Sequence, residues 1–158
     1  MQDMAAVTHI AAQVHPDYPE DDRIFAERLA LYPDGCLLLE MGQQSAGYVI
    51  SHPWLERQPP ALNSLLQALP ATPSTYYLHD IALLPAARGI GAASQLIARL
   101  MLLAQTSALR TMSLVAVNDS HAFWARHGFL VIDDPALQKK LNSYDAAACF
   151  LSREITRC

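Results

Sequence analysis

The chain has 158 residues, 52% of them hydrophobic, and its 15 acidic and 11 basic side chains give a formal net charge of −4. This length allows one domain with its own core but not two full-sized domains, so we expect residues 1–158 to form a single domain. The hydrophobic content excludes a disordered chain. The basic residues are scattered, with Lys139 and Lys140 as their only adjacent pair, which argues against nucleic-acid binding.

No membrane, targeting or metal signal is present. The longest uncharged stretch, residues 58–78, contains four prolines and cannot cross a bilayer as one helix. The N-terminus has no positively charged region before an apolar one, so we expect a cytoplasmic protein without membrane contacts. Cys36, Cys149 and Cys158 are odd in number and widely spaced, which predicts neither disulfides nor a metal site. The first two are expected in the core.

Two helices are predicted at the start of the chain. Asp3 can cap the first, whose apolar residues recur every three or four positions up to Val14. The second is expected from the acidic residues 20–22 to just before Pro33. It would bury Ile24, Phe25 and Leu29.

Strands and helices alternate in the rest of the chain. Strands are predicted over 36–40, 46–50, 75–84, 112–117, 129–132 and 146–153, and helices over 90–108, 120–127 and 135–141. The first two strands flank a short turn and form an antiparallel hairpin. Residues 52–75 carry five prolines and hold at most a short helix over 62–69. These elements predict a mixed α/β sheet.

The most informative segment is a strand end, turn and helix start between Leu78 and Leu96. Gly89 and Gly91 let backbone N–H groups approach a ligand, and the helix N-terminus adds its dipole. The predicted helix contains no acidic residue, and Arg88 can add a charge-assisted contact. These features predict a phosphate or pyrophosphate site. The simpler alternative is a tight strand-to-helix turn with a solvated Arg88.

A dinucleotide-binding fingerprint fits the same segment poorly. That fingerprint requires an acidic residue about 20 positions further on. Here Asp119 follows Gly91 by 28 positions, and Ser94 stands where the third glycine should be. Dinucleotide binding is therefore the least favoured interpretation.

Two motifs resemble the GNAT superfamily of acyl-CoA-dependent N-acetyltransferases. Arg88-Gly-Ile-Gly-Ala-Ala93 fits its Q/R-x-x-G-x-G/A pattern after a strand, and Val115-Ala-Val-Asn118 followed by residues 123–129 is similar to its fifth strand and F-Y-x-x-x-G-F turn. The element order agrees, except that this chain begins at the family's first helix. The resemblance implies a GNAT-like fold: a mixed, mostly antiparallel sheet, splayed at the motif strands, flanked by helices and apparently without the first strand.

The resemblance also implies how acetyl-CoA, the expected co-substrate, would bind. Its pyrophosphate would rest on the turn backbone of Arg88, Gly89, Ile90, Gly91, Ala92 and Ala93. Its pantetheine arm would pair with the main chain of Ile81, Ala82 and Leu83 like an added strand. The resemblance further implies that Leu83 N–H stabilises the oxyanion of the tetrahedral intermediate, with Asn118 and Phe123 on the opposite wall.

The expected acceptor is a primary amine that attacks directly in a ternary complex. A lysine-like amine has a pKa of about 10.4, so a base or a water chain must remove a proton. Asp80 is the first candidate, because some relatives, such as aminoglycoside 3-N-acetyltransferases, place an acid there, and His79 is the second. Strand alternation predicts that the two side chains point to opposite faces. The structural alternative is that Asp80 caps a backbone N–H and His79 packs under the Pro-rich segment.

The chain departs from the family at the usual Tyr, the proposed acid for the departing thiolate. Trp124 stands there, and indole cannot supply a proton, although a thiol with a pKa of about 8.5 can leave as a thiolate. Ser120, His121 and Tyr144 are conceivable substitutes. This departure motivates an alternative function, a non-catalytic acyl-CoA-binding or sensing module.

Acceptor selectivity is expected from residues 15–22 and the Pro-rich segment. The first can attract a protonated amine, or its acidic residues Glu20, Asp21 and Asp22 simply complement the dipole of the second helix. Tyr18 and Trp54 could wall an acceptor pocket or belong to the core. The identity of the amine stays open. The sheet edge left by the missing first strand could be covered by a second subunit, giving a homodimer.

Overall fold

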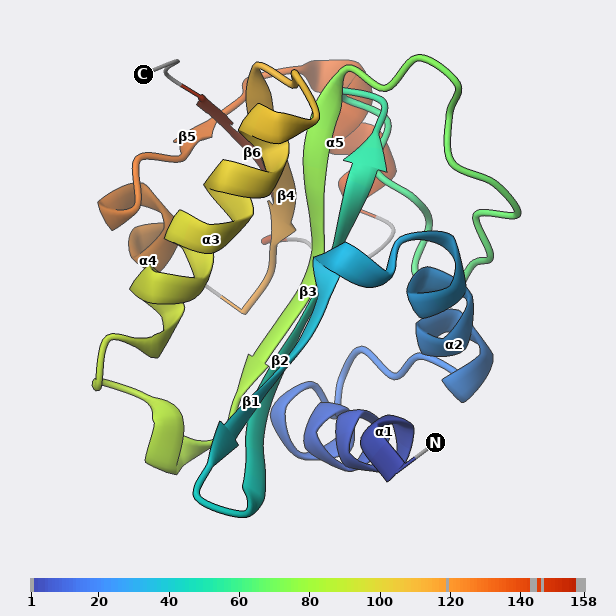
Figure 1. Cartoon of the computed structure of the whole chain (residues 1–158). Coiled ribbons are helices and arrows are strands. Elements are labelled where there is room, and N and C mark those ends of the chain that lie inside the picture. Colours follow the sequence, from blue (N-terminus) through green and yellow to red (C-terminus); the bar gives the residue numbers. More distant parts are fainter. Residues whose placement is uncertain (1, 119, 143–144, 146, 156–158) are drawn as a thin grey trace.

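A computed structural model describes residues 2–118, 120–142, 145 and 147–155. Asp119, Tyr144 and Cys158, and the first residue of the strand predicted over 146–153, lie outside this part. The elements are α1 (Gln2–Val14), α2 (Asp22–Leu31), β1 (Cys36–Met41), β2 (Gln44–Trp54), β3 (Thr75–Leu83), α3 (Ala92–Thr106), β4 (Thr111–Ala116), α4 (His121–Arg126), β5 (Leu130–Val131), α5 (Pro135–Leu141) and β6 (Cys149–Glu154) (Figure 1). Short 3₁₀ turns cover Pro33–Gly35 and Pro85–Ala87.

The strands form one mixed sheet in the order β1-β2-β3-β4-β6-β5. All neighbours are antiparallel except β3 and β4. These two pair only near their starts, Tyr76 with Met112 and Tyr77 with Ser113, and then diverge (Figure 1). The prediction of a mostly antiparallel sheet that splays at the motif strands is thus confirmed.

The closed end of this splay is fastened by side chains as well as by the ladder. Thr75 Oγ1 lies 3.0 Å from Ser113 Oγ and donates to Thr111 O at 3.2 Å. Thr75 and Ser113 are fully buried, so these bonds are shielded from competition with water.

Helices cover both faces of the sheet. α1 and α2 bury Ile10 and Phe25 against Tyr48 and Ala82 on one face. α3 and α4 lie on the other face and share a core with Tyr76, Leu78, Met112 and Leu114, while α5 covers Tyr77 and Phe150. Each fully buried Leu, Ile or Phe side chain contributes roughly 1.5–3 kcal/mol, so the helices are held mainly by their apolar faces.

The second helix differs from its prediction. Ile24 and Phe25 are buried as expected, but Leu29 is 40% exposed, and Arg28 is the buried residue of that turn. Arg28 replaces Leu29 because its guanidinium finds partners there: it bonds Glu27 and donates to Ser64 O at 2.8 Å. A buried charge is tolerated only with such partners.

The Pro-rich segment also differs. β2 continues through His52 and Pro53 to Trp54. Pro53 fits because β1 pairs with β2 only as far as Ile50, so the missing N–H costs no ladder bond. Residues 62–69 form no helix, and two of them, Asn63 and Gln67, have positive φ, which no α-helix accommodates.

Candidate active site

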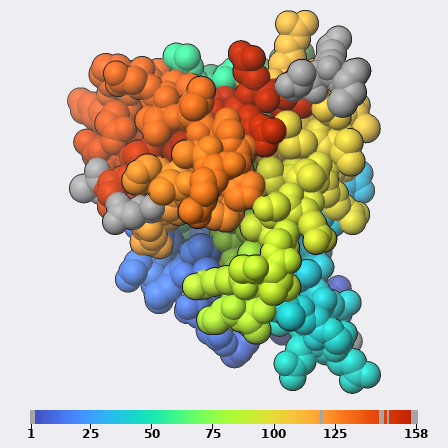
Figure 2. Space-filling view, turned by 90° about the vertical axis from the view of Figure 1, so that its left-hand side faces the viewer, coloured from blue at the N-terminus to red at the C-terminus, as the bar shows by residue number. Residues whose placement is uncertain are grey.

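A cavity of about 750 Å³ opens where β3 and β4 diverge. Its walls come from segments that are far apart in the sequence: the end of α1 and the following loop, β3, the turn into α3, and the residues from β4 into α4. Figure 2 shows the N-terminal segment (blue), the turn before α3 (yellow-green) and α4 (orange) side by side on one face. The cavity has the size of a small-molecule or cofactor site.

The turn into α3 leaves backbone amides uncovered at one end of the cavity. Gly89 and Gly91 have φ of 75° and 83°, and a Cβ at either would meet nothing within 4 Å. Glycine is therefore required by backbone conformation and not by lack of room. Gly91 precedes the first residue of α3 and no side chain caps that helix. Because its first turn also lacks an acidic residue, the helix dipole is left to act on an external anion.

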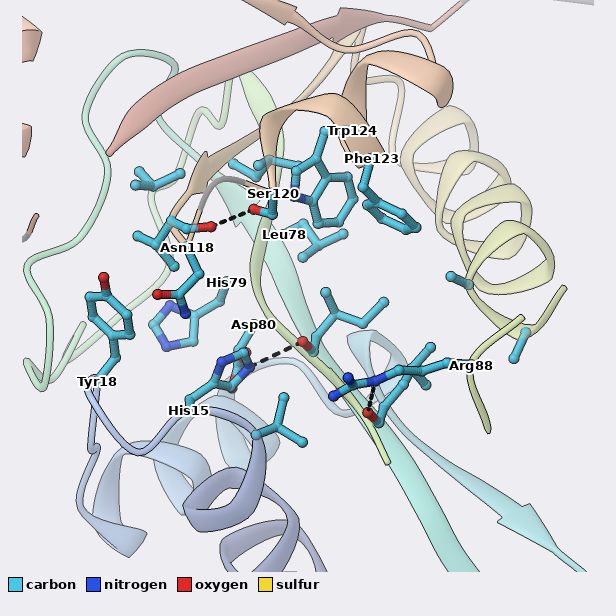
Figure 3. A pocket seen from close by; sticks show the side chains of 18 of the residues that line it. His15, Tyr18, Leu78, His79, Asp80, Arg88, Asn118, Ser120, Phe123 and Trp124 are labelled. Atoms are coloured by element: carbon cyan, nitrogen blue, oxygen red, sulfur yellow. Dashed lines mark hydrogen bonds and ion pairs between the residues drawn. The ribbon is translucent and has the colours of Figure 1, made fainter. Parts of the chain in front are cut away.

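Arg88 ties this turn back to β3. Its Nε donates to Leu83 O at 2.9 Å (Figure 3). Of the residues predicted to bind the pyrophosphate, Arg88, Gly89, Gly91, Ala92 and Ala93 line the cavity, whereas the Ile90 side chain is exposed and lies outside the lining.

The edge of β3 that faces the splay carries main-chain groups without a strand partner beyond Tyr77. Leu84 N–H donates to Ala46 O at 2.9 Å and so points toward β2. Since successive residues of a strand direct their N–H groups to opposite edges, Leu83 N–H points toward the splay. Ile81 and Leu83 line the cavity, while the Ala82 side chain is fully buried under α1.

His79 and Asp80 lie at an irregularity of β3. Opposite Ile50 stands Asp80, but opposite Ser51 stands Leu78, so His79 is one additional residue, a β-bulge. His79 and Asp80 both contact residues of the loop between α1 and α2 and both line the cavity. The expectation that they point to opposite faces is wrong, because the bulge interrupts the alternation on which it rests.

Asp80 is held by two side chains. Its Oδ1 lies 3.0 Å from His15 Nε2, and Tyr48 O–H donates to Oδ2. Burial raises the pKa of Asp80, but the hydrogen bond and charge of His15, together with Tyr48, outweigh it and hold the pKa below its usual value. Asp80 is thus an ionised carboxylate with both oxygens engaged. In the structural alternative given above its partner was a backbone N–H; here two side chains, His15 and Tyr48, take that place.

His79 belongs to a second pair. Its Nε2 lies 2.8 Å from Glu20 Oε2, and Glu20 Oε1 accepts the N–H of Asn63 at 3.0 Å. The His79 hydrogen bond and charge hold the pKa of Glu20 below its usual value against the opposing effect of burial. Glu20 therefore joins β3 to the Pro-rich segment, a role that the helix-dipole interpretation of residues 20–22 did not include.

Comparison with known proteins identifies the family. Residues 4–129 match the profile described as "Acetyltransferase (GNAT) family". The chain belongs to the GNAT acetyltransferase family. The resemblance deduced from its two motifs is thereby confirmed. No curated protein sequence matches the chain.

Several solved structures share the GNAT fold. Ard1 from Thermoplasma volcanium is 13% identical with a TM-score of 0.72, covering 99% of this chain and 93% of its own. The GphF GNAT-like decarboxylase, in complex with isobutyryl-CoA, is 13% identical with a TM-score of 0.78 and coverages of 98% and 96%. Rv2747 from Mycobacterium tuberculosis, in complex with CoA, is 13% identical with a TM-score of 0.70, and the match covers 98% of this chain and 95% of Rv2747. At such identities the likeness concerns the fold.

The opposite wall of the GNAT cavity is formed after β4. Asn118, which has a φ of 53°, and Phe123 line it. Ser120 lies there too, but its Oγ donates to Val117 O at 2.6 Å. Trp124, in place of the family's usual Tyr, is buried with its ring edge-on to Phe129 at 5.4 Å. His121 is exposed and outside the lining.

The structure also assigns the two aromatic residues whose place the sequence left open. Tyr18 lines the cavity, and its O–H donates to Asp145 Oδ2 at 2.7 Å, whereas Trp54 packs beside Tyr77 and donates to Gln58 O. Two residues of the site were missed from the sequence, His15 and Tyr48. His15 directly follows the apolar repeat of α1, which marks a helix end, but no local pattern pairs it with β3.

Within the described residues no helix is both long and apolar enough to cross a membrane. The same residues contain no cluster of three or more side chains of the kinds that hold a metal ion.

Proposed function

We propose that the protein transfers an acetyl group from acetyl-CoA to a primary amine, with direct attack of the amine on the thioester in a ternary complex. The observation that carries the proposal is the cavity itself: an uncapped helix N-terminus at one end, the unpaired edge of β3 along its length, and two histidine–carboxylate pairs at the other end. Family membership supports an acyltransferase.

Each part of the donor has a counterpart in the chain. The pyrophosphate would accept hydrogen bonds from the turn of residues 88–93, and the guanidinium of Arg88 adds positive charge. The pantetheine amides would pair with the main chain of Ile81 and Leu83. Asn118 and Phe123 would close the other side.

The chemistry follows from this placement. The lone pair of the amine attacks the thioester carbon, a C–N bond forms, and the carbonyl electrons move onto oxygen, where Leu83 N–H stabilises them. The intermediate then collapses, the C–S bond breaks, and sulfur keeps the electron pair. A thiol with a pKa of about 8.5 is a good leaving group, so the reaction does not depend on an acid at Trp124.

Calorimetric titration with acetyl-CoA and CoA tests binding, and release of free thiol with a panel of polyamines, amino acids and peptides tests transfer. Mass spectrometry should find the acceptor heavier by one acetyl group. Arg88→Ala should weaken binding about tenfold by loss of a charge-assisted contact, while Arg99→Ala, an exposed residue of α3 outside the cavity, should not.

Three results would change the assignment. Absence of any response to millimolar acetyl-CoA contradicts the proposal altogether. Binding without transfer to any amine leaves the non-catalytic acyl-CoA-binding module, which Trp124 motivates. The third result concerns malonyl-CoA, which is tested as an alternative acyl donor because GphF is a GNAT-like decarboxylase. Release of carbon dioxide from malonyl-CoA in the absence of amine would indicate decarboxylation instead of acetyl transfer.

A further inference from the structure

We infer that His15 accepts the proton of the attacking amine and that Asp80 positions His15 for this task. The inference rests on the proposed function and names a step in it that the family motifs do not cover. His15 lies at the end of α1, outside both motifs, and its side chain reaches the splayed edge of β3. Figure 3 shows the His15 ring beside Asp80, below the wall that carries Ser120 and Trp124.

The hydrogen bonds of His15 fix its tautomer. Nε2 lies 3.0 Å from Asp80 Oδ1 and 3.2 Å from Ile81 O. A carbonyl oxygen can only accept, so the hydrogen must sit on Nε2. In the neutral ring, Nδ1 then keeps its lone pair, and no described residue bonds it. This is the arrangement in which a carboxylate orients an imidazole that acts as a base.

Asp80 is built to hold His15 and not to act itself. Tyr48 O–H occupies its other oxygen, and the carboxylate is too weak a base to take a proton from an ammonium group. The bulge at His79 turns Asp80 toward α1. The main-chain N–H of His15 donates to Ala11 O at 2.8 Å, which continues the helical hydrogen bonding of α1 as far as His15. Both partners are thereby held by rigid elements.

His79 is less suited to the same role. Its ring bonds Glu20, which in turn holds the main chain of Asn63, and its side chain is 8% exposed against 22% for His15. His79 therefore anchors the Pro-rich segment, while His15 is the histidine that an acceptor can reach. The His79–Glu20 pair thus has a structural role, and the His15–Asp80 pair takes part in the chemistry.

The proton balance is complete without a further reactant. As the C–N bond forms, the proton on the amine nitrogen moves to His15 Nδ1, and the ring becomes an imidazolium stabilised by Asp80. After the C–S bond breaks, the imidazolium returns the proton to the thiolate sulfur. The products are the amide and CoA with its thiol, and His15 is neutral again.

The surroundings of His15 adjust its pKa for this cycle. Burial lowers the pKa, but the hydrogen bond and charge of Asp80 on β3, the carbonyl of Ile81 and the charge of Glu20 raise it above 6.5. Tyr48 on β2 and His79 on β3 act on Asp80 and so bear on the ring through it. Activity should therefore rise with pH as the imidazolium loses its proton, over a range above 6.5.

Substitution of His15 and Asp80 tests the inference. His15→Gln keeps an N–H donor for Asp80 but has no basic lone pair, so kcat/KM with a primary amine should fall about 100-fold while the acetyl-CoA dissociation constant stays within threefold. His9→Gln, which changes an exposed histidine of α1 that contacts Gln13, is the matched control and should match the wild type. Asp80→Asn should move the rising limb of the pH profile to lower pH.

Imidazole NMR gives a readout independent of turnover. The His15 ring should titrate above 6.5 with its hydrogen on Nε2, and Asp80→Asn should lower that titration. If His15→Gln keeps kcat/KM within threefold of the wild type, the inference about His15 is wrong while the proposed function stands. The same holds if NMR places the ring hydrogen of His15 on Nδ1. A wild type that binds acetyl-CoA but acetylates no amine overturns the proposed function, and with it the assignment of a base.

Discussion

The glycines of the turn before α3 illustrate how single residues shape the proposed donor site. Gly91 adopts a left-handed conformation and leaves the first amides of α3 uncovered. An L-residue there costs roughly 1–2 kcal/mol and adds a methyl group where the turn meets the cavity. The strain and the loss of binding can be separated, because the hairpin residue Gly42 has a similar φ of 66° and equally open surroundings.

Gly91→Ala and Gly42→Ala should therefore lose similar stability, about 1 kcal/mol each in urea unfolding. Only Gly91→Ala should also raise the acetyl-CoA dissociation constant, by about tenfold, because it disturbs the amides at the N-terminus of α3. Equal dissociation constants in the two variants would show that the turn does not hold the phosphates.

At this scale the sequence predicted which residues of the turn lie together better than it predicted the surroundings of Asp80. Gly89, Gly91 and Arg88 are close in sequence, and their spacing alone brings them together. His15 and Tyr48 come from other elements, and only the packing of α1 on the β2–β3 pair brings them to Asp80. A motif contains the residues that a turn positions, but not those that a tertiary contact positions.

Among the elements, α2 and the Pro-rich segment form one unit. Glu27 accepts the N–H groups of Leu66 and Gln67, each at 2.8 Å, and bonds Arg28, which is 1% exposed. Burial lowers the pKa of Arg28, so the guanidinium depends on this partner. The segment lines the cavity through Pro60 and its neighbours, which makes α2 its support.

Glu27→Ala should therefore destabilise the fold by about 3 kcal/mol, since it leaves a buried charge without its partner. It should also raise KM for the acceptor, because the wall of the cavity loosens. Arg23→Ala, also on α2, removes the exposed ion pair with the N-cap residue Asp21 and should cost less than about 1 kcal/mol. Equal losses in chemical denaturation would contradict the role given to Glu27.

The element boundaries explain where the sequence misled. The apolar spacing of residues 62–69 resembles that of a short helix. The main-chain amides of Leu66 and Gln67, however, donate to the Glu27 carboxylate and not to the main chain of a helical turn. The bulge at His79 leaves no trace in the residue pattern, because alternation of side chains resumes after it in the opposite phase. The mostly antiparallel sheet and its splay, by contrast, followed from the resemblance to the family.

For the whole molecule, two histidines act on stability in opposite directions. His52 is 1% exposed, no described residue bonds its Nε2, and burial with the nearby His79 lowers its pKa to about 3. The unfolded chain takes up this proton near pH 6.5 and the folded chain does not, so His52 costs stability as pH falls below 6.5. His15 has a raised pKa, so its contribution is complete below 6.5 and is lost at higher pH.

His52→Phe should accordingly flatten the acid side of the stability curve. Between pH 7 and pH 5 the wild type should lose about 2 kcal/mol through His52, and the variant should lose correspondingly less. Urea unfolding at the two pH values measures the difference, with His9→Gln as a control for an exposed histidine. An unchanged pH dependence in His52→Phe would assign the acid sensitivity to other groups.

The short ladder between β3 and β4 has a mechanical consequence. Two residue pairs and the bonds of Thr75 join the half-sheet β1-β2-β3 to the half-sheet β4-β6-β5. The sheet is thus joined only where β3 and β4 begin, and the amides of Ile81 and Leu83 lack strand partners. A bound pantetheine chain would supply them, so acetyl-CoA should slow hydrogen exchange at these two amides far more than at β1. The bound donor would then extend the short connection between the two half-sheets and hold them together along the rest of β3.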